Sequence, residues 1–581
     1  MHTETDIKKV LRSGWVPYPE DQLDDILNEA SPAIQECIIT LAERVQKLSE
    51  IGTALSAERD LPRLLEKIVE EARNLTHADG GSIYLMSDDE TELYFEIAQT
   101  TSLGIRMGGT SGKMSFPPIP LYDEDGSPNH SNTSTHCALS GDIVNIPDVY
   151  AGDGEFDFSG PKRFDEANDY RTKSQLSVPF RNHEDEIIGV LQLINAQDPD
   201  TGEFIPFSNE AQELTSSLAS QAAVAITNTR LIQDLENLFE SLIQVIAAAV
   251  DEKSPYTGGH IERVANLTVE IAEEINKTDE GELGHVHFDE DEMKELRIAA
   301  WLHDLGKITT PEYVVDKATK LETIYDKVNA VRLRYEIKKR DLEILRLKQK
   351  LKAGEKAEHS GSEAAPDGRI EQEMERLNDE REWVKTANVG GEYITDEKKK
   401  RIEQIATQTY ELEGEAQPLL EPLEVKNLQI GRGTLNEEER QIIQNHASVS
   451  KKMLERLPYP KKLRRIPEYA GAHHEKLDGS GYPDGKTEEE LPMQARIMAL
   501  ADVFEALTAE DRPYKPGKKL SEAMKIMGFM VKDYHIDARI FRLFIQSGLA
   551  KKYAKEHVKP KQIDYLEYDL EGKPITDNGS E

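Results

Sequence analysis

Histidines and aspartates that could share metal ions recur in the second half of this 581-residue chain, which has 15 histidines in all. The side chains in question are His260, His303, Asp304, His446, His473, His474 and Asp502. Imidazole and carboxylate ligands together suit iron, manganese or zinc better than magnesium, which prefers oxygen ligands. These ligands exceed what one ion needs, and two ions ~3.5–4 Å apart can hold an attacking hydroxide between them. The residue types therefore indicate a two-metal hydrolytic site.

Each of these residues taken alone has a plainer interpretation. A His-Asp pair such as His303–Asp304 arises by chance in many proteins, and a lone helical histidine is more often a hydrogen-bonded core residue than a ligand. His285 and His287, in the loop-like run GELGHVHFD, illustrate this alternative, because we expect them simply to be exposed. The order of the whole set, with its surrounding motifs, is what favours a site.

Those motifs resemble the HD-GYP family of the HD phosphohydrolase superfamily. They are YTGGH, HDLGK, the helical run around His446, HHEKLDGSGYP and ADVFEALTAEDRPYK, and they cover about residues 250–316 and 426–550. The resemblance implies an all-α domain that hydrolyses cyclic di-GMP to pGpG or GMP with two divalent ions, iron or manganese. It implies a first ion held by His260, His303, Asp304 and Asp502. It implies a second ion, bridged to the first by Asp304, on His446, His473 and His474.

Four further side chains are predicted to contact the substrate. Lys307, at the helix end in HDLGK, could reach a phosphoryl oxygen and offset its charge. Tyr482, in the GYP turn, and Arg512 and Lys515, in DRPYK, resemble residues that contact substrate in this family. Their plainer interpretations are a turn-forming tyrosine and surface bases. Tyr256 stands where some members have a glutamate for a third ion, so we expect two ions.

The first half of the chain resembles a GAF domain over residues 41–228. The motifs are ADGGSIYL, VNIPDVY, YRTKSQLSVPF and IIGVLQLINA, and they imply an antiparallel sheet with flanking helices. Strands are predicted from Ser82, from Glu92, and over 142–146, 175–180 and 187–194, after one helical pattern over 48–78. Asn195–Ala196 and the run FIPFSNE depart from the Asn-Lys and Phe-x-x-x-Asp-Glu signature of cyclic-nucleotide-binding members. Another small-molecule ligand and a ligand-free dimerising module both stay open.

A helix that we expect Ser208 to cap follows the GAF region and has a heptad pattern. One series is Leu218, Ala225, Ile232, Phe239 and Ile246. The companion series is Leu214, Gln221, Asn228, Leu235 and Leu242. Such a seam, with polar residues that set register, predicts a parallel homodimer that joins sensor to output. A buried helix in a monomer is the alternative.

A second helical region interrupts the HD-GYP motifs. Charge-rich helical patterns over 317–352, 370–384 and 396–414 enclose a polar reversal over 353–368. We expect an antiparallel helical arm inserted into the output domain, which could gate access, bind a partner or act as a solvated spacer. The site can still close over it, because long insertions cost little loop-closure entropy.

Composition restricts the class of protein. Lys and Arg number 71 against 109 Asp and Glu, and the net charge of −38 disfavours a nucleic-acid polymer as partner. Two cysteines exclude a disulfide framework and suit a reducing compartment. The chain shows no secretory h-region and no apolar run near the ~20 residues that span a bilayer, so we expect a cytoplasmic protein without membrane contact.

Together these patterns predict a multidomain, predominantly α protein with an α/β GAF domain. Its expected parts are a helical segment (1–40), a GAF sensor (41–228), a coiled-coil linker (229–250), HD-GYP parts (251–316 and 426–550), the inserted arm (317–425) and a tail (551–581). The first hypothesis is a cyclic di-GMP phosphodiesterase regulated by the GAF domain. The alternatives are the same chemistry on another cyclic dinucleotide or phosphoester, and a catalytically silent scaffold.

Overall fold

The computed structural model describes residues 31–575 except 113, 115, 152–153, 155, 254–257, 358–366, 391–392 and 510–516. Contacts divide the chain into two units, Met1–Leu238 and Phe239–Glu581. Among the described residues, no helix combines the length and apolar character needed to cross a bilayer.

The first unit is built on one antiparallel sheet with strand order β3-β2-β1-β7-β6-β5. Its main strands are β1 (Ala78–Met86), β2 (Glu92–Thr100), β3 (Ile105–Gly108), β5 (Val144–Ile146), β6 (Gln175–Arg181) and β7 (Ile187–Gln197). Two short strands extend it: β4 (Ile119–Pro120) beside β2 and β8 (Phe204–Ile205) beside β7. The central pairing of β1 with β7 sets Ile83 opposite Leu191. The five predicted strands are confirmed, with small changes at their ends.

Helices cover both faces of this sheet. On one face α3 (Pro32–Ala57), α4 (Leu61–Thr76) and the start of α7 (Asn209–Asp251) enclose the larger core. On the other face, α5 (Thr133–Ser140) packs through Cys137 against Val190, and α6 (Ser159–Asn168) follows. The single helix predicted over 48–78 is two helices, because Asp60 caps a new one by accepting a hydrogen bond from the backbone N–H of Arg63.

The long helix α7 corrects the predicted dimer seam. Ser208 caps it as expected, since its Oγ accepts a hydrogen bond from Ala211 N (3.1 Å). Leu218 and Ala225, predicted as seam residues, are instead buried in the core of their own unit. That part of the pattern belongs to the core of the first unit, and exposed apolar residues of the heptad, such as Ile232, Leu235 and Leu242, occur only further along the helix.

The second unit is a helical domain with an inserted arm. Its domain helices are α8 (His260–Asn276), α9 (Glu290–Leu302), α10 (Glu312–Val315), α15 (Glu437–Leu454), α16 (Ile466–Gly471), α17 (Met493–Thr508), α18 (Leu520–Lys532), α19 (Ala538–Gln546) and α20 (Leu549–His557). Short 3-10 helices are η2 (Leu305–Thr309), η3 (Lys461–Leu463) and η4 (Pro560–Gln562). α8, α9 and α17 meet in one core through side chains such as Val264, Leu296 and Leu500. This core holds the helix ends from which the polar side chains project.

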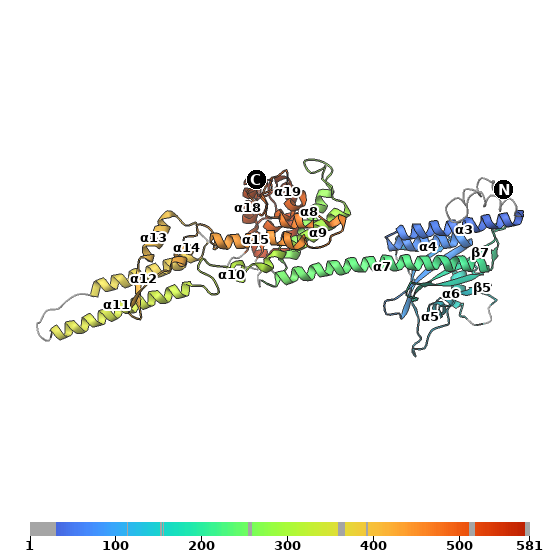
Figure 1. The fold of residues 1–581 in the computed structure, drawn as a ribbon, viewed down its shortest axis with the longest axis horizontal. Coiled ribbons are helices and arrows are strands. Elements are labelled where there is room, and N and C mark those ends of the chain that lie inside the picture. Colours follow the sequence, from blue (N-terminus) through green and yellow to red (C-terminus); the bar gives the residue numbers. More distant parts are fainter. Residues whose placement is uncertain are drawn as a thin grey trace, which may run out of the picture. The chain divides into compact units, whose positions relative to one another are not determined.

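The arm has its own small core, formed by residues such as Tyr335, Leu377 and Ile402. Its helices are α11 (Val328–Ala357), α12 (Asp367–Asn388), α13 (Asp396–Ala406) and α14 (Pro422–Leu428), and α11 lies beside α12 (Figure 1). The helix predicted over 317–352 is present as α11, but it begins only at Val328. The helix predicted over 396–414 is present as α13, but it ends at Ala406.

A β-hairpin replaces the last part of that predicted helix. The hairpin pairs β9 (Thr409–Leu412) with β10 (Glu415–Pro418) through the two-residue turn Glu413–Gly414. Both turn residues have positive φ (54° and 85°), as a tight hairpin turn of this length requires, and glycine supplies that conformation without steric cost.

Candidate metal centre

The predicted metal ligands come from five separate elements and meet in one place. His260 is the first residue of α8, and His303 and Asp304 lie between α9 and η2. The remaining ligands lie in α15, just after α16 and in α17: His446, His473, His474 and Asp502. Most are fully buried, and His474 and Asp502 are partly buried. The domain core therefore brings together polar groups that are up to 242 residues apart in sequence, the separation of His260 and Asp502.

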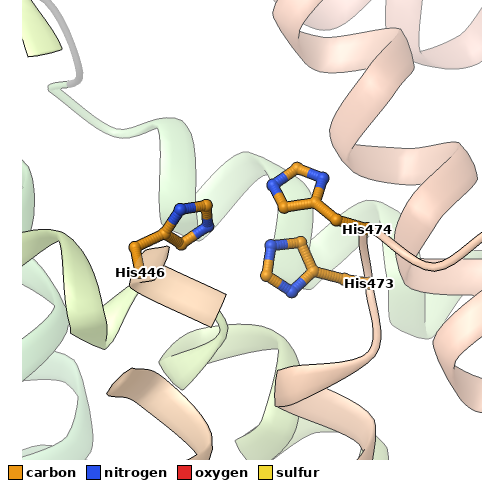
Figure 2. A group of neighbouring side chains, drawn as sticks. All are labelled: His446, His473 and His474. Carbon is orange, nitrogen blue, oxygen red and sulfur yellow. The ribbon is translucent and has the colours of Figure 1, made fainter. Parts of the chain in front are cut away.

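Two compact groups of ligand atoms are present. The imidazoles of His446, His473 and His474 point toward one another, and their ligand nitrogens lie within 4.8 Å of one another (Figure 2). The ligand atoms of His260, His303 and Asp304 meet the same limit. We call these the triple-histidine group and the mixed group.

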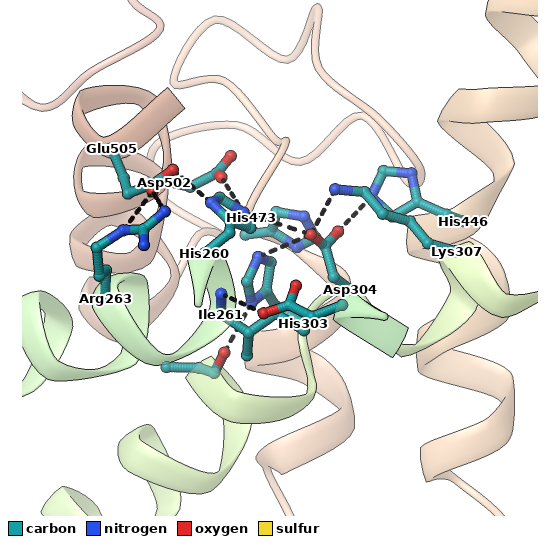
Figure 3. A network of polar contacts seen from close by, with 12 residues as sticks. His260, Ile261, Arg263, His303, Asp304, Lys307, His446, His473, Asp502 and Glu505 are labelled. Carbon is teal, nitrogen blue, oxygen red and sulfur yellow. Dashed lines mark hydrogen bonds and ion pairs between the residues drawn. The ribbon is translucent and has the colours of Figure 1, made fainter. Parts of the chain in front are cut away.

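Asp304 faces both groups with different oxygens (Figure 3). Its Oδ2 lies 3.3 Å from His303 Nε2 and 3.6 Å from His260 Nε2. Its Oδ1 lies 3.4 Å from His446 Nε2 in the other group. Asp502 Oδ1 is 3.4 Å from His260 Nε2 and so completes the mixed group. These separations are too long for good hydrogen bonds.

The donor atoms fit divalent transition metals. His303, His446 and His473 each direct Nδ1 at the carbonyl oxygen of the residue three positions earlier, at 2.7 Å for His303 and 2.6 Å for His473. That contact makes Nδ1 the protonated nitrogen and leaves Nε2 as a lone-pair donor. The Nε2 atoms of all three are buried without a hydrogen-bond partner in the described part of the chain. Buried, unsatisfied nitrogens aimed at one point are what a metal site requires.

Comparison with known families agrees with this geometry. A GAF domain model matches residues 60–226, and two HD domain models match residues 257–410 and 418–540. The chain joins a GAF domain to an HD domain. The two HD matches together include all of the predicted metal ligands.

Curated relatives match parts of the HD domain. The 3′3′-cGAMP-specific phosphodiesterase 1 of Vibrio cholerae is 39% identical over 116 residues, which are 20% of this chain and 26% of the relative. A cyclic di-GMP phosphodiesterase of Thermotoga maritima is 42% identical over 93 residues, which are 16% of this chain and 25% of the relative. The chain thus spans about a quarter of the length of these relatives.

A solved structure resembles the GAF domain only distantly. The crystal structure of the GAF domain from Acinetobacter phosphoenolpyruvate-protein phosphotransferase is 16% identical. The match covers 33% of this chain and 98% of that chain, with a TM-score of 0.25.

Two residues that the sequence interpretation missed support the mixed group. Glu505 Oε2 contacts Nδ1 of His260, and Arg263 donates to Glu505 Oε1 from Nε (2.8 Å) and Nη2 (2.6 Å). Glu505 follows Asp502 by three positions in α17, as Arg263 follows His260 in α8, so each pair shares a helix face. This spacing is the signal that could have identified them. A carboxylate behind a histidine fixes the ring and raises its basicity as a ligand.

Charge and burial give the HD domain's two groups different protonation. Burial lowers the pKa of His473 far below its usual value, and the neighbouring His474 lowers it further. Burial also lowers the pKa of His474, to about 3. For His260 burial acts in the same direction, but the carboxylates of Asp304, Asp502 and Glu505 outweigh it and raise the pKa well above its usual value.

Asp304 is held as a carboxylate. Burial alone raises its pKa, but the Lys307 ammonium and His303 outweigh that effect and hold the pKa well below its usual range. Lys307 Nζ lies 2.5 Å from Asp304 Oδ2. An ionised aspartate between two histidine groups is ready to act as a bridging ligand.

The predicted substrate residues divide into two sets. Lys307 and Tyr482 lie at the metal centre, and the Tyr482 ring centroid is 4.8 Å from that of His474. Burial raises the pKa of the Tyr482 hydroxyl, so it stays protonated. Arg512 and Lys515 lie outside the described residues, as does Tyr256. His285 and His287 are exposed, as predicted.

The HDLGK segment packs unusually close to α15. Ser450 Oγ accepts from Gly306 N and donates to His303 O, both at 2.8 Å. A Cβ on Gly306 would lie 2.0 Å from the carbonyl oxygen of His446, so no larger residue fits there. This contact brings the two groups of ligands to the same side of the domain.

The GYP loop is held by another buried carboxylate that the sequence interpretation missed. Glu475 accepts hydrogen bonds from the backbone N–H groups of Asp484 (2.6 Å), Gly485 (3.1 Å) and Lys486 (3.0 Å). The loop between them contains Tyr482, whose ring is thereby kept beside His474.

Proposed function

We propose that the HD domain hydrolyses a phosphodiester bond of a cyclic dinucleotide, with cyclic di-GMP as the first substrate, under control of the GAF domain. The observation that supports this most strongly is the position of Asp304, whose two oxygens face the two ligand groups. The partial relatives named for cyclic di-GMP and for 3′3′-cGAMP support the substrate class.

The ligand groups suggest how two divalent ions, iron or manganese, would be shared. The first ion would be held by His260, His303, Asp304 and Asp502. The second would be held by Asp304, His446, His473 and His474. When bound, such ions supply Lewis-acid charge that activates water and polarises a phosphoryl group.

The chain's own residues contribute binding and charge. Neutral His473 and His474 have no proton to lose before they act as ligands. Lys307, at the edge of the cluster, is in position to pair with a phosphoryl oxygen as charge develops there. Tyr482 offers a flat ring against which a purine can stack. Addition of water to phosphorus breaks the P–O3′ bond, O3′ receives the proton, and the linear dinucleotide is formed.

Product analysis of the full-length protein tests this proposal. Protein loaded anaerobically with manganese or ferrous iron should convert cyclic di-GMP to pGpG or GMP, and His303→Ala should abolish the conversion. A 3′3′-cGAMP reaction in parallel tests the second candidate, which the Vibrio cholerae relative favours. Fewer than one tightly bound ion per chain, without any product, would support the scaffold interpretation instead.

We also propose that α7 mediates homodimerisation through its middle part. Ile232, Leu235 and Leu242 are 53%, 66% and 53% exposed, although they continue the heptad pattern. Apolar side chains at this spacing on one helix suit a second copy of the same helix. Leu235→Asp should shift the mass measured by light scattering from dimer to monomer. A monomeric wild-type protein would contradict the proposal.

A further inference from the structure

The arm joins the HD domain through a short neck, which we define as Lys317 at its start and Thr434 at its end. Thr434 Oγ1 donates a hydrogen bond to the carbonyl oxygen of Lys317 (2.9 Å), so the two chain segments of the neck are bonded to each other. Near it, Asn427 of α14 contacts Asn436, the N-cap residue of α15 (3.0 Å). The neck therefore lies against the N-terminus of α15.

A buried ion pair connects this neck to α15. Lys317 Nζ lies 2.7 Å and 2.8 Å from the two carboxylate oxygens of Glu439, and the Lys317 side chain is fully buried. Glu439 also accepts a hydrogen bond from Asn436 N (2.9 Å) and so completes the capping box of the helix. The Glu439 carboxylate thus both stabilises the N-terminus of α15 and binds Lys317 of the neck.

The same helix face continues to the metal centre. His446 follows Glu439 by seven residues, which is about two helical turns or roughly 10 Å. Ser450 follows one turn later and bonds to the backbone of His303 and Gly306. Because 439, 446 and 450 share one face, α15 is attached on both sides of His446: to the arm at Glu439 and to the HDLGK segment at Ser450.

A second, exposed pair joins α14 of the arm to the same helix, α15, and provides the contrast. Lys426 Nζ lies 2.6 Å and 2.7 Å from the carboxylate of Glu438, with the side chains 52% and 65% exposed. Water and salt screen such a pair, so it contributes little to fixing the position of α15. A buried pair constrains the helix strongly, because loss of one partner leaves the other charge desolvated and unpaired.

We propose that Lys317 and Glu439 are positioning residues that set α15 so that His446 meets Asp304, which makes the inserted arm part of the triple-histidine half of the metal centre. The inference rests on the proposed metal-dependent function. The proposal gives the inserted arm a structural role, because the neck would determine whether the second ion is bound. This role does not depend on what the far end of the arm contacts.

Metal counting on full-length variants tests this inference. Manganese titration of Lys317→Met, followed by elemental analysis, should show the second ion bound more weakly, by up to about 10- to 100-fold, which is the cost of losing a group bonded directly to a ligand and therefore an upper bound here. The first ion should bind as in the wild type. Lys317→Arg, which keeps the charge, should retain both ions, and so should the matched control Lys426→Met. Turnover of cyclic di-GMP should fall in parallel with the second ion.

If Lys317→Met fails to fold, Glu439→Gln can be measured in its place. Its amide oxygen can still accept the hydrogen bond from Asn436 N, so the capping of α15 is kept while the ion pair is lost. The inference is overturned if Lys317→Met and Glu439→Gln keep both ions, as Lys426→Met should, or if they lose both ions equally. It is also overturned if the wild type holds fewer than two ions. A wild type that holds two ions, loses the second in Lys317→Met and hydrolyses no cyclic dinucleotide would refute the proposed substrate alone.

Discussion

The two halves of the proposed metal centre contain similar side chains in opposite electrostatic settings. In the mixed group, three carboxylates surround His260 and raise its pKa. In the triple-histidine group, burial and mutual repulsion keep His473 and His474 neutral. An imidazole must be neutral to bind a metal, so the second group is ready to bind and the first must release a proton. The types of the ligands alone therefore do not predict the protonation state in which each half would meet a metal ion.

The outer support of the two halves differs as well. His260 is held by side chains, Glu505 and behind it Arg263. His446 and His473 are held by backbone carbonyls of their own helical turns. A point substitution can remove a side-chain support but not a carbonyl. His303 of the mixed group is also held by a backbone carbonyl, so among these histidines His260 is the one whose direct support a point substitution can remove.

The largest expected effect removes the residue common to both halves. Asp304→Asn keeps the size of the side chain but removes the charge that faces His303 and His446. Both ions should be lost, and turnover should fall by more than the roughly 10- to 100-fold typical of an outer-sphere change. Elemental analysis and product assays measure this, with Asp291→Asn, at a partly exposed carboxylate, as control. Retention of one ion at full affinity would show that the halves are independent.

A smaller and one-sided effect is expected from Glu505→Gln. The amide cannot support His260 as a carboxylate does, so the affinity for the first ion should fall about 10- to 100-fold. The triple-histidine group should keep its ion, as seen in a two-step manganese titration. Glu488→Gln, at an exposed carboxylate, is the control. Equal weakening of both ions would remove the distinction between the halves.

Acidification should separate the halves without any substitution. The raised pKa of His260 means that a proton competes with the first ion, so its affinity should rise with pH by about tenfold per unit below that pKa. His474, with a pKa of about 3, binds no competing proton between pH 6 and 8. Metal content after equilibration from pH 8 down to 6 should drop by one ion first. Simultaneous loss of both ions would contradict this order.

The smallest expected effect concerns substrate rather than metal. Tyr482→Phe keeps the ring beside His474 and removes one hydroxyl, so KM for cyclic di-GMP should rise by at most about tenfold, with metal content unchanged. Tyr482→Ala removes the stacking surface as well and should raise KM further. Steady-state kinetics of the two variants distinguish the ring from the hydroxyl; identical KM values would leave the ring without a role.

Much of the molecule could be predicted because its patterns are local. Alternating strands such as Glu92–Thr100 and the cap at Ser208 depend on near neighbours, and the structure has them. The helix predicted over 396–414 stops at Ala406, because the hairpin built on the tight turn Glu413–Gly414 replaces the rest of the charge-rich helical pattern. The heptad in α7 failed in part because Leu218 and Ala225 fit a core of the same chain as well as a partner helix.

The sequence by itself predicted the ligand set, since the types and order of the histidines and aspartates indicate a two-metal hydrolytic site. The tertiary structure alone decided which oxygen of Asp304 faces which group, that Glu505 stands behind His260, and that Lys317 is buried against Glu439. Burial and distance control charge interactions, and neither can be obtained from spacing along a chain when the partners lie on different elements.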